Sequence, residues 1–448
     1  MNHVGFLVKL FGQSTNETAL VWKGHATSYG ELAARLNSAR EQLTQAGIEP
    51  GAVVALEADF SPNAVGWLLA VIDLGGVVVP LTSAVEMQKP ELRGIVSTEF
   101  RVVVDADDRA SVHQTGARCD HPLVRELRRR AHPGLVLFSS GSTGKSKAAL
   151  HDLVPFLEKY KVPRRAFRTI GFLLFDHIGG INTLLYALAN GGTVVVVEKR
   201  TPDTICQAVE RYKVNLLPTS PTFLNLLMLS DALQRHDLSS LEVITYGTEP
   251  MPESLLKRLH TAFPRARLQQ TYGLSEVGIL RSKSRSNDSL WMKIGGEGFQ
   301  IRVVDGMLEI KAQSAMMGYF NHPSPFTEDG WFKTGDLVEQ DGEYFRILGR
   351  ASEMINVGGE KLFPAEVESV LGEIPGVLEV TVSGETNSLT GQLVCARVRL
   401  SGNESVPDFR IRMRTFCQGR LAPFKIPQKV VLADRPLHSE RFKKNRSS

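Results

Sequence analysis

The segment Phe138 to Lys147 contains the residues of this chain whose types and spacing most clearly suggest chemistry. It reads FSSGSTGKSK and combines five small hydroxyl residues with two glycines and two lysines. Backbone N–H groups in such a glycine-rich turn form a concave surface of donors for phosphate oxygens, and a lysine adds positive charge. Because the apolar run LVLF leads directly into it, the segment predicts a phosphate-binding loop anchored by a buried strand.

Gly144, Lys145 and Ser146 read GKS, which suggests the P-loop of kinases and ATPases. That motif also requires a glycine five positions before Gly144, and Ser139 occupies this position. The spacing therefore argues against a standard P-loop enzyme, and the loop is expected to serve another phosphate chemistry.

The elements that position this loop alternate between helices and short strands. Residues 27–46 begin with a hydroxyl cap and place Leu32, Leu36 and Leu43 near one helical face. Short apolar runs recur between helical stretches, among them VVVPL, FRVVVDA, GTVVVVE and LEVITYG. This alternation predicts a mostly parallel sheet covered on both faces, with ligands at the carboxyl ends of its strands.

The pattern changes after about Ser286. FQIRVVDGMLEIKAQ alternates and turns at Asp305-Gly306, as a β-hairpin does. Beyond Arg350 a second unit has a helix at 364–371 and strands near LEVTVSGE and LVCARVRL. We therefore expect an α/β protein. Its large N-terminal domain, residues 1–350, would hold mixed, mostly parallel sheets with helices and a β-rich subdomain, and residues 351–448 would form a small α+β domain.

Composition limits the classes of protein to which the chain can belong. Its 448 residues, 42% hydrophobic and 22% charged, are typical of a globular protein of two or three domains. The 52 basic and 48 acidic residues nearly cancel, so we expect no nucleic-acid partner.

Four cysteines without a CxxC pair suit buried thiols in a reducing compartment. The apolar run AVGWLLAVIDLGGVVVPL is interrupted by Asp73 and three glycines, which favours a core helix and strand over a transmembrane segment. We expect a cytoplasmic protein, and the sequence does not indicate its oligomeric state.

Several motifs follow the phosphate loop, and together they resemble the adenylate-forming superfamily of acyl-CoA synthetases, luciferases and nonribosomal adenylation domains. The resemblance covers nearly the whole chain and is closest to acyl- and aryl-CoA ligases. The segments that carry it are SSGSTGKSK, TYGLSEVG (271–278), GWFKTGDL (330–337), LGR (348–350) and MINVGGEKLFPAEVE (354–368).

The resemblance implies that a carboxylate is joined to the α-phosphate of ATP, that pyrophosphate is expelled, and that the acyl group passes to a nucleophile, most often a thiol. ATP and a carboxylate repel each other, so the site must neutralise both and align them. The implied cofactors and partners are ATP, Mg²⁺, a small carboxylic acid, and CoA or the phosphopantetheine of a carrier protein. The leading hypothesis is an acid–thiol ligase, most simply an acyl-CoA synthetase.

The resemblance also assigns the nucleotide site. Glu276 is expected to bind Mg²⁺, because a hard cation on phosphate oxygens prefers a carboxylate. Tyr272 would lie against the adenine, with residues 246–250 as the opposite wall, and Asp336 would accept hydrogen bonds from the ribose hydroxyls with help from Arg350. The phosphate-binding residues would be Ser140, Gly141, Ser142, Thr143, Gly144 and Lys147, and the other nucleotide contacts Gly247, Thr248, Glu249, Pro250, Thr271, Gly273 and Ser275.

The acid is expected beside His177 in LLFDHIGGINTLL, which is similar to the segment that faces the reacting carboxylate in acyl-CoA synthetases. Asp176 raises an alternative, since amino-acid-activating domains bind the substrate ammonium with an aspartate. Asp176 has the right spacing for that role only if Phe175, rather than His177, aligns with the family's aromatic position. We favour an acid without an amino group, in a pocket whose walls include Asn182, Gly247 and Thr248.

Family members carry a catalytic lysine near the C-terminus, and Lys443 is our candidate, with Lys444 as its rival. Phe442 precedes it where glycine is usual. The small domain is expected to turn about Ser352 between the two steps, so that Gly358 and Gly359 line a channel for the pantetheine thiol.

Two other functions stay open on the sequence alone. One is a stand-alone adenylation enzyme that loads a carrier protein or forms an amide. The other is a nucleotide-binding homologue that has lost turnover, which the replacements at Phe442 and Ser352 make conceivable.

Overall fold

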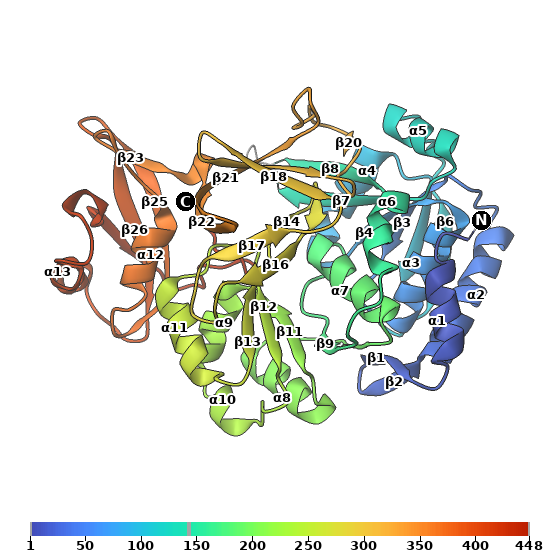
Figure 1. Ribbon diagram of the computed structural model, residues 1–448, viewed down its shortest axis with the longest axis horizontal. Helices are drawn as coiled ribbons and strands as arrows, with labels where there is room; N and C mark the ends of the chain where they lie inside the picture. The colour runs from blue at the N-terminus through green and yellow to red at the C-terminus, as the bar shows by residue number, and fades with distance from the viewer. Residues whose placement is uncertain (1, 141–144, 447–448) are drawn as a thin grey trace.

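The computed structural model describes residues 2–140 and 145–446, and two seven-stranded sheets form its larger part (Figure 1). In the first sheet four central strands run parallel, and antiparallel strands flank them on both sides. In spatial order its strands are β20 (Gly318–Tyr319), β8 (Ser146–Asp152), β7 (Gly134–Ser140), β4 (Val77–Leu81), β3 (Val53–Glu57), β5 (Phe100–Val104) and β6 (Ala110–Gln114).

The second sheet is parallel throughout except for the hairpin at one edge. Its order is β13 (Arg267–Gln270), β12 (Val243–Tyr246), β11 (Leu216–Thr219), β9 (Arg168–Ile170), β10 (Thr193–Val195), β1 (Thr18–Trp22) and β2 (His25–Ser28). The helices and 3-10 turns of this part are α1 (Gly5–Gln13), α2 (Tyr29–Gln45), α3 (Pro62–Leu74), η1 (Ser83–Gln88), α4 (Lys89–Val96), α5 (Pro122–Arg130), α6 (Leu153–Leu157), η2 (Glu158–Tyr160), α7 (Ile178–Ala189), α8 (Pro202–Tyr212), α9 (Pro221–Leu229), α10 (Ala232–Arg235) and α11 (Glu253–Ala262).

Local sequence explains where the first long helix begins. Ser28 caps α2: its hydroxyl accepts the N–H of Glu31 at 3.1 Å, and the Glu31 carboxylate accepts the N–H of Ser28 at 2.7 Å. This capping box satisfies two helix-end N–H groups that would otherwise lack partners. Leu32, Leu36 and Leu43 are buried, so the helix predicted over residues 27–46 is confirmed.

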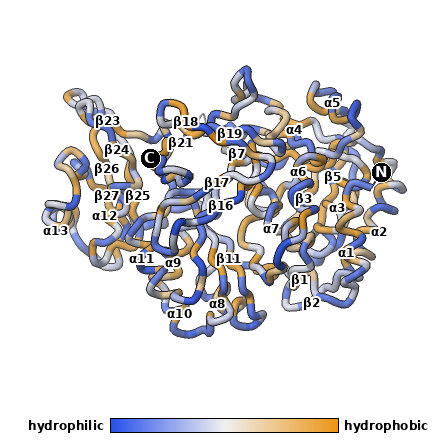
Figure 2. Tube along the Cα trace, in the orientation of Figure 1, coloured by the Kyte–Doolittle hydropathy of each residue, from blue (hydrophilic) through white to orange (hydrophobic). Residues whose placement is uncertain are grey.

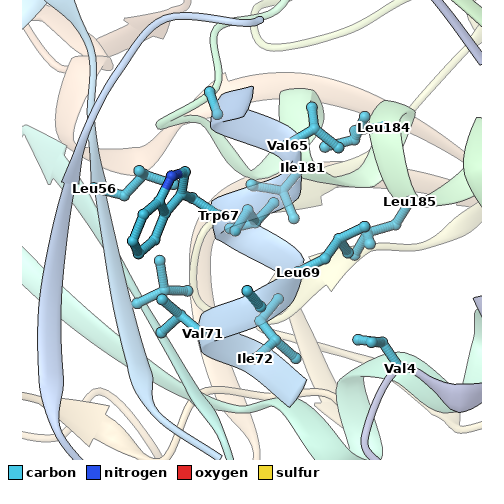
Figure 3. Packing of buried hydrophobic residues seen from close by; sticks show 14 of the residues in the cluster. Val4, Leu56, Val65, Trp67, Leu69, Val71, Ile72, Ile181, Leu184 and Leu185 are labelled. Atoms are coloured by element: carbon cyan, nitrogen blue, oxygen red, sulfur yellow. The ribbon is translucent and has the colours of Figure 1, made fainter. Parts of the chain in front are cut away.

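The apolar run at residues 64–81 forms a core helix and a buried strand, as predicted. Helix α3 is hydrophobic on nearly every side and almost completely buried. Figure 3 shows its side chains between Leu56 of the first sheet and Ile181, Leu184 and Leu185 of α7. This packing fixes α7 against the first sheet. Among the described residues, every helix is too short or too polar to cross a membrane.

The β-rich subdomain follows the second sheet in the chain. Asp305 and Gly306 form a two-residue turn with positive φ angles of 50° and 75°, as expected for this hairpin. A two-stranded ladder of β14 (Gly273–Leu274) and β15 (Gly278–Ile279) lies before the six-stranded sheet. That sheet has the order β16 (Arg281–Ser284), β17 (Met292–Gly295), β22 (Tyr344–Arg350), β21 (Phe332–Asp341), β19 (Met307–Ala312) and β18 (Phe299–Val304).

The last part of the chain has a hydrophobic core of its own, drawn from residues 355–432. Hydrophobic residues concentrate along the strands and inner helices, whereas peripheral loops are mostly hydrophilic (Figure 2). After the last strand the chain returns to the larger part, where Phe442 packs against the core around the second sheet. The elements of this small unit are η3 (Ala351–Glu353), β23 (Ile355–Val357), β24 (Glu360–Leu362), α12 (Pro364–Leu371), β25 (Val377–Asn387), β26 (Gly391–Leu400), α13 (Val406–Cys417), η4 (Pro423–Lys425) and β27 (Lys429–Leu432).

Candidate active site

The expected phosphate loop joins two antiparallel strands, β7 and β8, whose last pair is Ser140 opposite Ser146. The predicted residues Gly141, Ser142, Thr143 and Gly144 lie outside the described residues, as does the side chain of Ser140. Lys147 is described, and its ammonium lies 5.7 Å from the centre of the Tyr319 ring. The apolar strand before the loop is buried, as predicted.

Glu276 lies next to this hairpin because β20 pairs with β8. The hydroxyl of Tyr319, in β20, donates to Oε1 of Glu276 at 2.7 Å. Below it, Nε2 of the fully buried His151 lies 2.6 Å from the carbonyl oxygen of Ser275. Among the described residues no group of three or more His, Cys, Asp or Glu side chains could enclose a metal ion. A single carboxylate beside a phosphate loop nevertheless fits Mg²⁺, which is usually held by one or two carboxylates together with phosphate oxygens.

The two residues assigned to the ribose, Asp336 and Arg350, form a compact group with Tyr272, which was assigned to the adenine. Nε of Arg350 lies 2.8 Å from Oδ1 of Asp336, its cross-strand partner, and the hydroxyl of Tyr272 donates to Oδ2 at 2.5 Å. Burial raises the pKa of Asp336, although Arg350 and the Tyr272 hydroxyl act in the opposite direction. The structure thus brings Tyr272, Asp336 and Arg350 together.

Residues 246–250 form a tight turn after β12. A Cβ at Gly247 would lie 2.5 Å from Oγ1 of Thr271, so only glycine fits there without a shift. Thr248 has a φ of 73°, which is uncommon for a residue other than glycine. Oε1 of Glu249 accepts the N–H of Thr222 at 2.7 Å, and its Oε2 accepts the N–H of Lys444 at 3.1 Å. This wall therefore contacts the C-terminal tail, the segment after β27 (residues 433–446).

His177 caps the N-terminus of α7. Its Nδ1 accepts the N–H of Gly179 at 3.0 Å. Burial, together with the charges of Lys443 and Arg441, lowers the pKa of His177 to about 3. The ring is therefore neutral near pH 7, and because Nδ1 is an acceptor, Nε2 carries the proton. His177 can thus donate one hydrogen bond to an acid without adding a charge.

Asp176 faces the tail. Its Oδ2 accepts the hydroxyl of Thr82 at 2.9 Å and lies 2.8 Å from the guanidinium of Arg441. The side chain is buried. Because the carboxylate is already neutralised by Arg441, the arrangement does not favour the alternative in which Asp176 binds a substrate ammonium.

Lys443 interacts electrostatically with several of these groups. Solvent still reaches its side chain, yet enough protein surrounds it that desolvation is the main cause of a lowered pKa. Arg441 and Arg350 lower this pKa further, whereas Glu249 and Glu276 raise it. Lys443 is thus within electrostatic range of Arg350 of the ribose group, of Glu276, the expected Mg²⁺ ligand, and of His177.

Lys444 points elsewhere. Its Nζ lies 2.8 Å from Oε2 of Glu368 in α12, and Nε of Arg446 lies 2.9 Å from Oε1 of the same carboxylate. Burial would raise the pKa of Glu368, but the charges of Lys444 and Arg446 lower it to about 2. Lys444 is therefore part of a buried ion-pair network that fastens the tail to the small domain.

Phe442 holds the tail to the larger part. Its ring centre lies 5.4 Å from that of Phe172 and 5.5 Å from that of Phe223, while His438 stacks on it at 5.6 Å. Its carbonyl oxygen accepts the hydroxyl of Ser220 at 2.9 Å. The residue adopts a left-handed φ of 53°, the conformation that favours glycine. The sequence marked Phe442 only as an irregularity, and its place in an aromatic cluster was not foreseen.

A cavity of about 870 Å³ lies between α7, the region of η2 and the faces of β11, β12 and β13, and His177 is not among its lining residues. Asn182 lines it, as expected, and so does Thr271. Gly247 and Thr248, which were expected beside Asn182, are not among its lining residues. Lys159 is, and no motif in the sequence pointed to it.

Gly358 and Gly359 are not brought to this cluster. They form the exposed turn of the β23/β24 hairpin, with positive φ angles of 62° and 95°. Their backbone N–H groups donate within the small domain, to Thr390 and Asn356.

Comparison with known families agrees with this two-part architecture. The family described as "AMP-binding enzyme" matches residues 11–319, and the one described as "AMP-binding enzyme C-terminal domain" matches residues 366–444. The chain therefore belongs to the AMP-binding enzymes, the adenylate-forming superfamily that the motifs resemble.

Individual relatives are similar over most of their length. An indoleacetate–CoA ligase of Aromatoleum aromaticum is 28% identical over 94% of this chain and 92% of its own. A feruloyl-CoA synthase of an Amycolatopsis species is 27% identical over 94% and 93%. The crystal structure of the anthranilate CoA ligase AuaEII with anthranoyl-AMP superposes with a TM-score of 0.83 at 20% identity, and covers 100% of this chain and 96% of that one. The α/β fold with a small C-terminal domain is thus that of the superfamily.

Proposed function

We propose that this protein activates a carboxylic acid with ATP as an acyl-adenylate and then transfers the acyl group to a thiol, most simply that of CoA. The observation that carries the proposal is the position of Lys443 within electrostatic range of His177, Glu249, Glu276 and Arg350. The relatives named as CoA ligases support the choice of a thiol acceptor.

In the first step an oxygen of the acid attacks the α-phosphorus of ATP. The bond from this phosphorus to the bridging oxygen breaks, and pyrophosphate leaves with the electron pair. The loop after β7, with Lys147, would hold the departing phosphates, and Glu276 would hold Mg²⁺, which neutralises their charge. Asp336 would bind the ribose. Nε2–H of His177 would orient the acid, and the ammonium of Lys443 would stabilise the negative charge between the carboxylate and the α-phosphate.

Lys443 is preferred to Lys444 for a physical reason. The ammonium of Lys444 is already paired with the buried Glu368, and moving it to a substrate would leave that carboxylate short of a partner. Lys443 has no carboxylate within salt-bridge distance among the described residues, so its charge is available to a substrate.

In the second step a thiol sulfur attacks the acyl carbon, and AMP leaves. We infer that residues 1–350 act as the adenylation domain and residues 351–448 as a mobile domain. Ser352 is exposed in η3 and would act as the hinge. The rotation would bring the exposed turn at Gly358 and Gly359 to the site, where small residues leave room for pantetheine.

The test is acid-dependent ATP–pyrophosphate exchange over fatty, aryl and amino acids, followed by analysis of thioesters formed with CoA. We expect exchange and acyl-CoA with at least one acid that lacks an amino group. Exchange without acyl-CoA would replace CoA by a carrier protein or an amine. No exchange with any acid would leave a nucleotide-binding homologue without turnover.

A further inference from the structure

The cavity that contains Asn182 has more positive charge than its own acids can balance. Its volume, about 870 Å³, lies within the range of small-molecule sites. Of its two lining carboxylates, Glu158 is already paired with Lys161 at 2.5 Å, which leaves Glu297. Lys159, Arg164, Arg267 and Arg281 also line the cavity, and none of them forms an ion pair with a carboxylate in the described part of the chain. A net positive, roomy cavity favours an anionic ligand.

Lys159 lies deepest among these cations. Its Nζ donates to Oδ1 of Asn182 at 2.9 Å and to the carbonyl oxygen of Ile279 at 3.2 Å, and it lies 4.9 Å from the centre of the Tyr160 ring. These partners are all neutral. An ammonium has three N–H donors, so one is left for a ligand. Burial, with a smaller contribution from Arg164, lowers the pKa of Lys159 to about 7, which shows how poorly the protein alone compensates the charge.

The neighbouring cations add to the uncompensated positive charge around Lys159. Arg164 contributes to the low pKa of Lys159, and Arg281 in turn contributes, after burial, to a lowered pKa of Arg164. Like charges gathered at one site destabilise each other. An anion bound among Lys159, Arg164 and Arg281 would remove this repulsion and supply the missing acceptor.

The geometry relates this group to the reacting end of the acid. His177 caps α7, and Asn182, which holds Lys159, lies five residues further along the same helix. Five residues of α-helix correspond to about 7.5 Å along the axis. A single carboxylate could not reach both places, whereas a molecule with two acidic groups could.

We propose that the acid activated by this protein carries a second anionic group, separated from the reacting carboxylate, and that Lys159 and Arg164 bind it. This inference rests on the proposed function, since it names the class of acid for that site. These cations could instead bind the 3′-phosphate of CoA. The test below distinguishes this phosphate from a second anionic group on the acid.

The test compares adipate with hexanoate, a diacid and a monoacid of the same chain length, in ATP–pyrophosphate exchange without CoA. For the unmodified protein we expect kcat/KM to be about tenfold or more higher for adipate, as for one charge-assisted hydrogen bond. Lys159→Met should remove this preference, because kcat/KM should fall more for adipate than for hexanoate. Lys257→Met, on the exposed face of α11 and paired with Glu253, is the matched control and should keep it.

Equal rates for the two acids, or an unchanged preference in Lys159→Met, would overturn the inference and leave the proposed function standing. If Lys159→Met only raises the KM for CoA in thioester formation, the cations bind the CoA phosphate, and this result would also overturn the inference. If Lys159→Met does not fold, as judged by thermal melting, Arg164→Gln decides by the same ratio. If no acid supports exchange, calorimetric titration with adipate and hexanoate decides: tighter binding of adipate that Lys159→Met abolishes supports the inference, and equal binding contradicts it.

Discussion

The C-terminal tail and the cavity at Asn182 both bring several cations to one place, but the cations have different partners in the two regions. In the tail, Arg441 is paired with the buried Asp176, and Lys444 and Arg446 share the buried Glu368. In the cavity, Lys159 and Arg164 have only neutral acceptors or like charges nearby. Paired cations define the path of the backbone, whereas unpaired cations keep their charge for a ligand.

Lys443 is the exception within the tail. It stands between paired neighbours without a carboxylate in salt-bridge distance among the described residues, and desolvation lowers its pKa. By this comparison, the proposals make Lys443 and Lys159, like Lys147 in the expected phosphate loop, lysines that would keep their charge for substrate groups. The substitutions below test this distinction from the largest expected effect to the smallest, and a prediction on pH follows them.

Glu368→Gln should be the most damaging change to the fold. It leaves Lys444 and Arg446 without their buried counter-charge, and breaking a buried pair from one side typically costs about 3–5 kcal/mol. The measurement is denaturant unfolding followed by a probe in the small domain. Glu366→Gln, whose partner Lys425 is more accessible, is the control and should change little. Equal stability of the two variants would contradict a structural role for the Glu368 network.

Lys443→Met should abolish most exchange without unfolding the protein. Removal of one preorganised donor raises the barrier by about 2.7–4 kcal/mol, so the rate of exchange should fall by two to three orders of magnitude, which is about what this energy implies. Lys429→Met, in an exposed pair with Glu385, should keep full activity. A loss below tenfold, with the melting temperature unchanged, would assign the chemistry to another residue.

Phe442 gives a paired test of how the tail is docked. Phe442→Ala loses the ring contacts and keeps a side chain on the left-handed backbone. Phe442→Gly loses the same contacts but also removes the cost of about 1–2 kcal/mol that a residue with a Cβ has in the left-handed conformation. Both should slow exchange, and the alanine variant should be slower by about fivefold or more. If the two variants behave alike, the left-handed backbone is not retained when the tail is docked.

The last prediction is a pH dependence of stability from Lys159. The ordinary pKa of this group is 10.5, and burial lowers it to about 7 in the folded protein. Between these values the unfolded chain binds a proton that the folded chain does not, so stability should rise with pH in this window. Lys159→Met should lose this component, and Lys257→Met should retain it. Unfolding of the three proteins at pH 7, 8.5 and 10 measures the difference, and parallel pH profiles would contradict it.

Local patterns were sufficient to predict much of the fold. The Ser28 cap, the apolar run of α3 and the Asp305-Gly306 turn all act within a few residues of themselves, so the sequence reveals them directly. The order of the motifs singled out Tyr272, Asp336 and Arg350 in the same way, and the structure brings these three residues into one group.

The remaining features depend on partners that are distant in the chain. Asp176 lies 265 residues from Arg441, its ion-pair partner, so its spacing to His177 could not reveal its role. Lys159 occurs in LEKYKV, which reads as a polar surface segment. Its burial depends on Asn182 and Ile279, which other elements supply.

The end of the tail, at Lys444 and Arg446, contacts the small domain and the larger part through bonds of unequal strength. At Lys444 the small domain grips the side chain through the buried Glu368, while the larger part accepts only the backbone N–H, through Glu249. Arg446 adds a second charged grip on the side of the small domain. In the proposed rotation the tail would move with the small domain through Glu368, after the Asp176–Arg441 pair and the Phe442 contacts with the larger part have separated. The lysine would then be withdrawn from the site by the same movement that admits the thiol, so that one motion sets the order of the two steps.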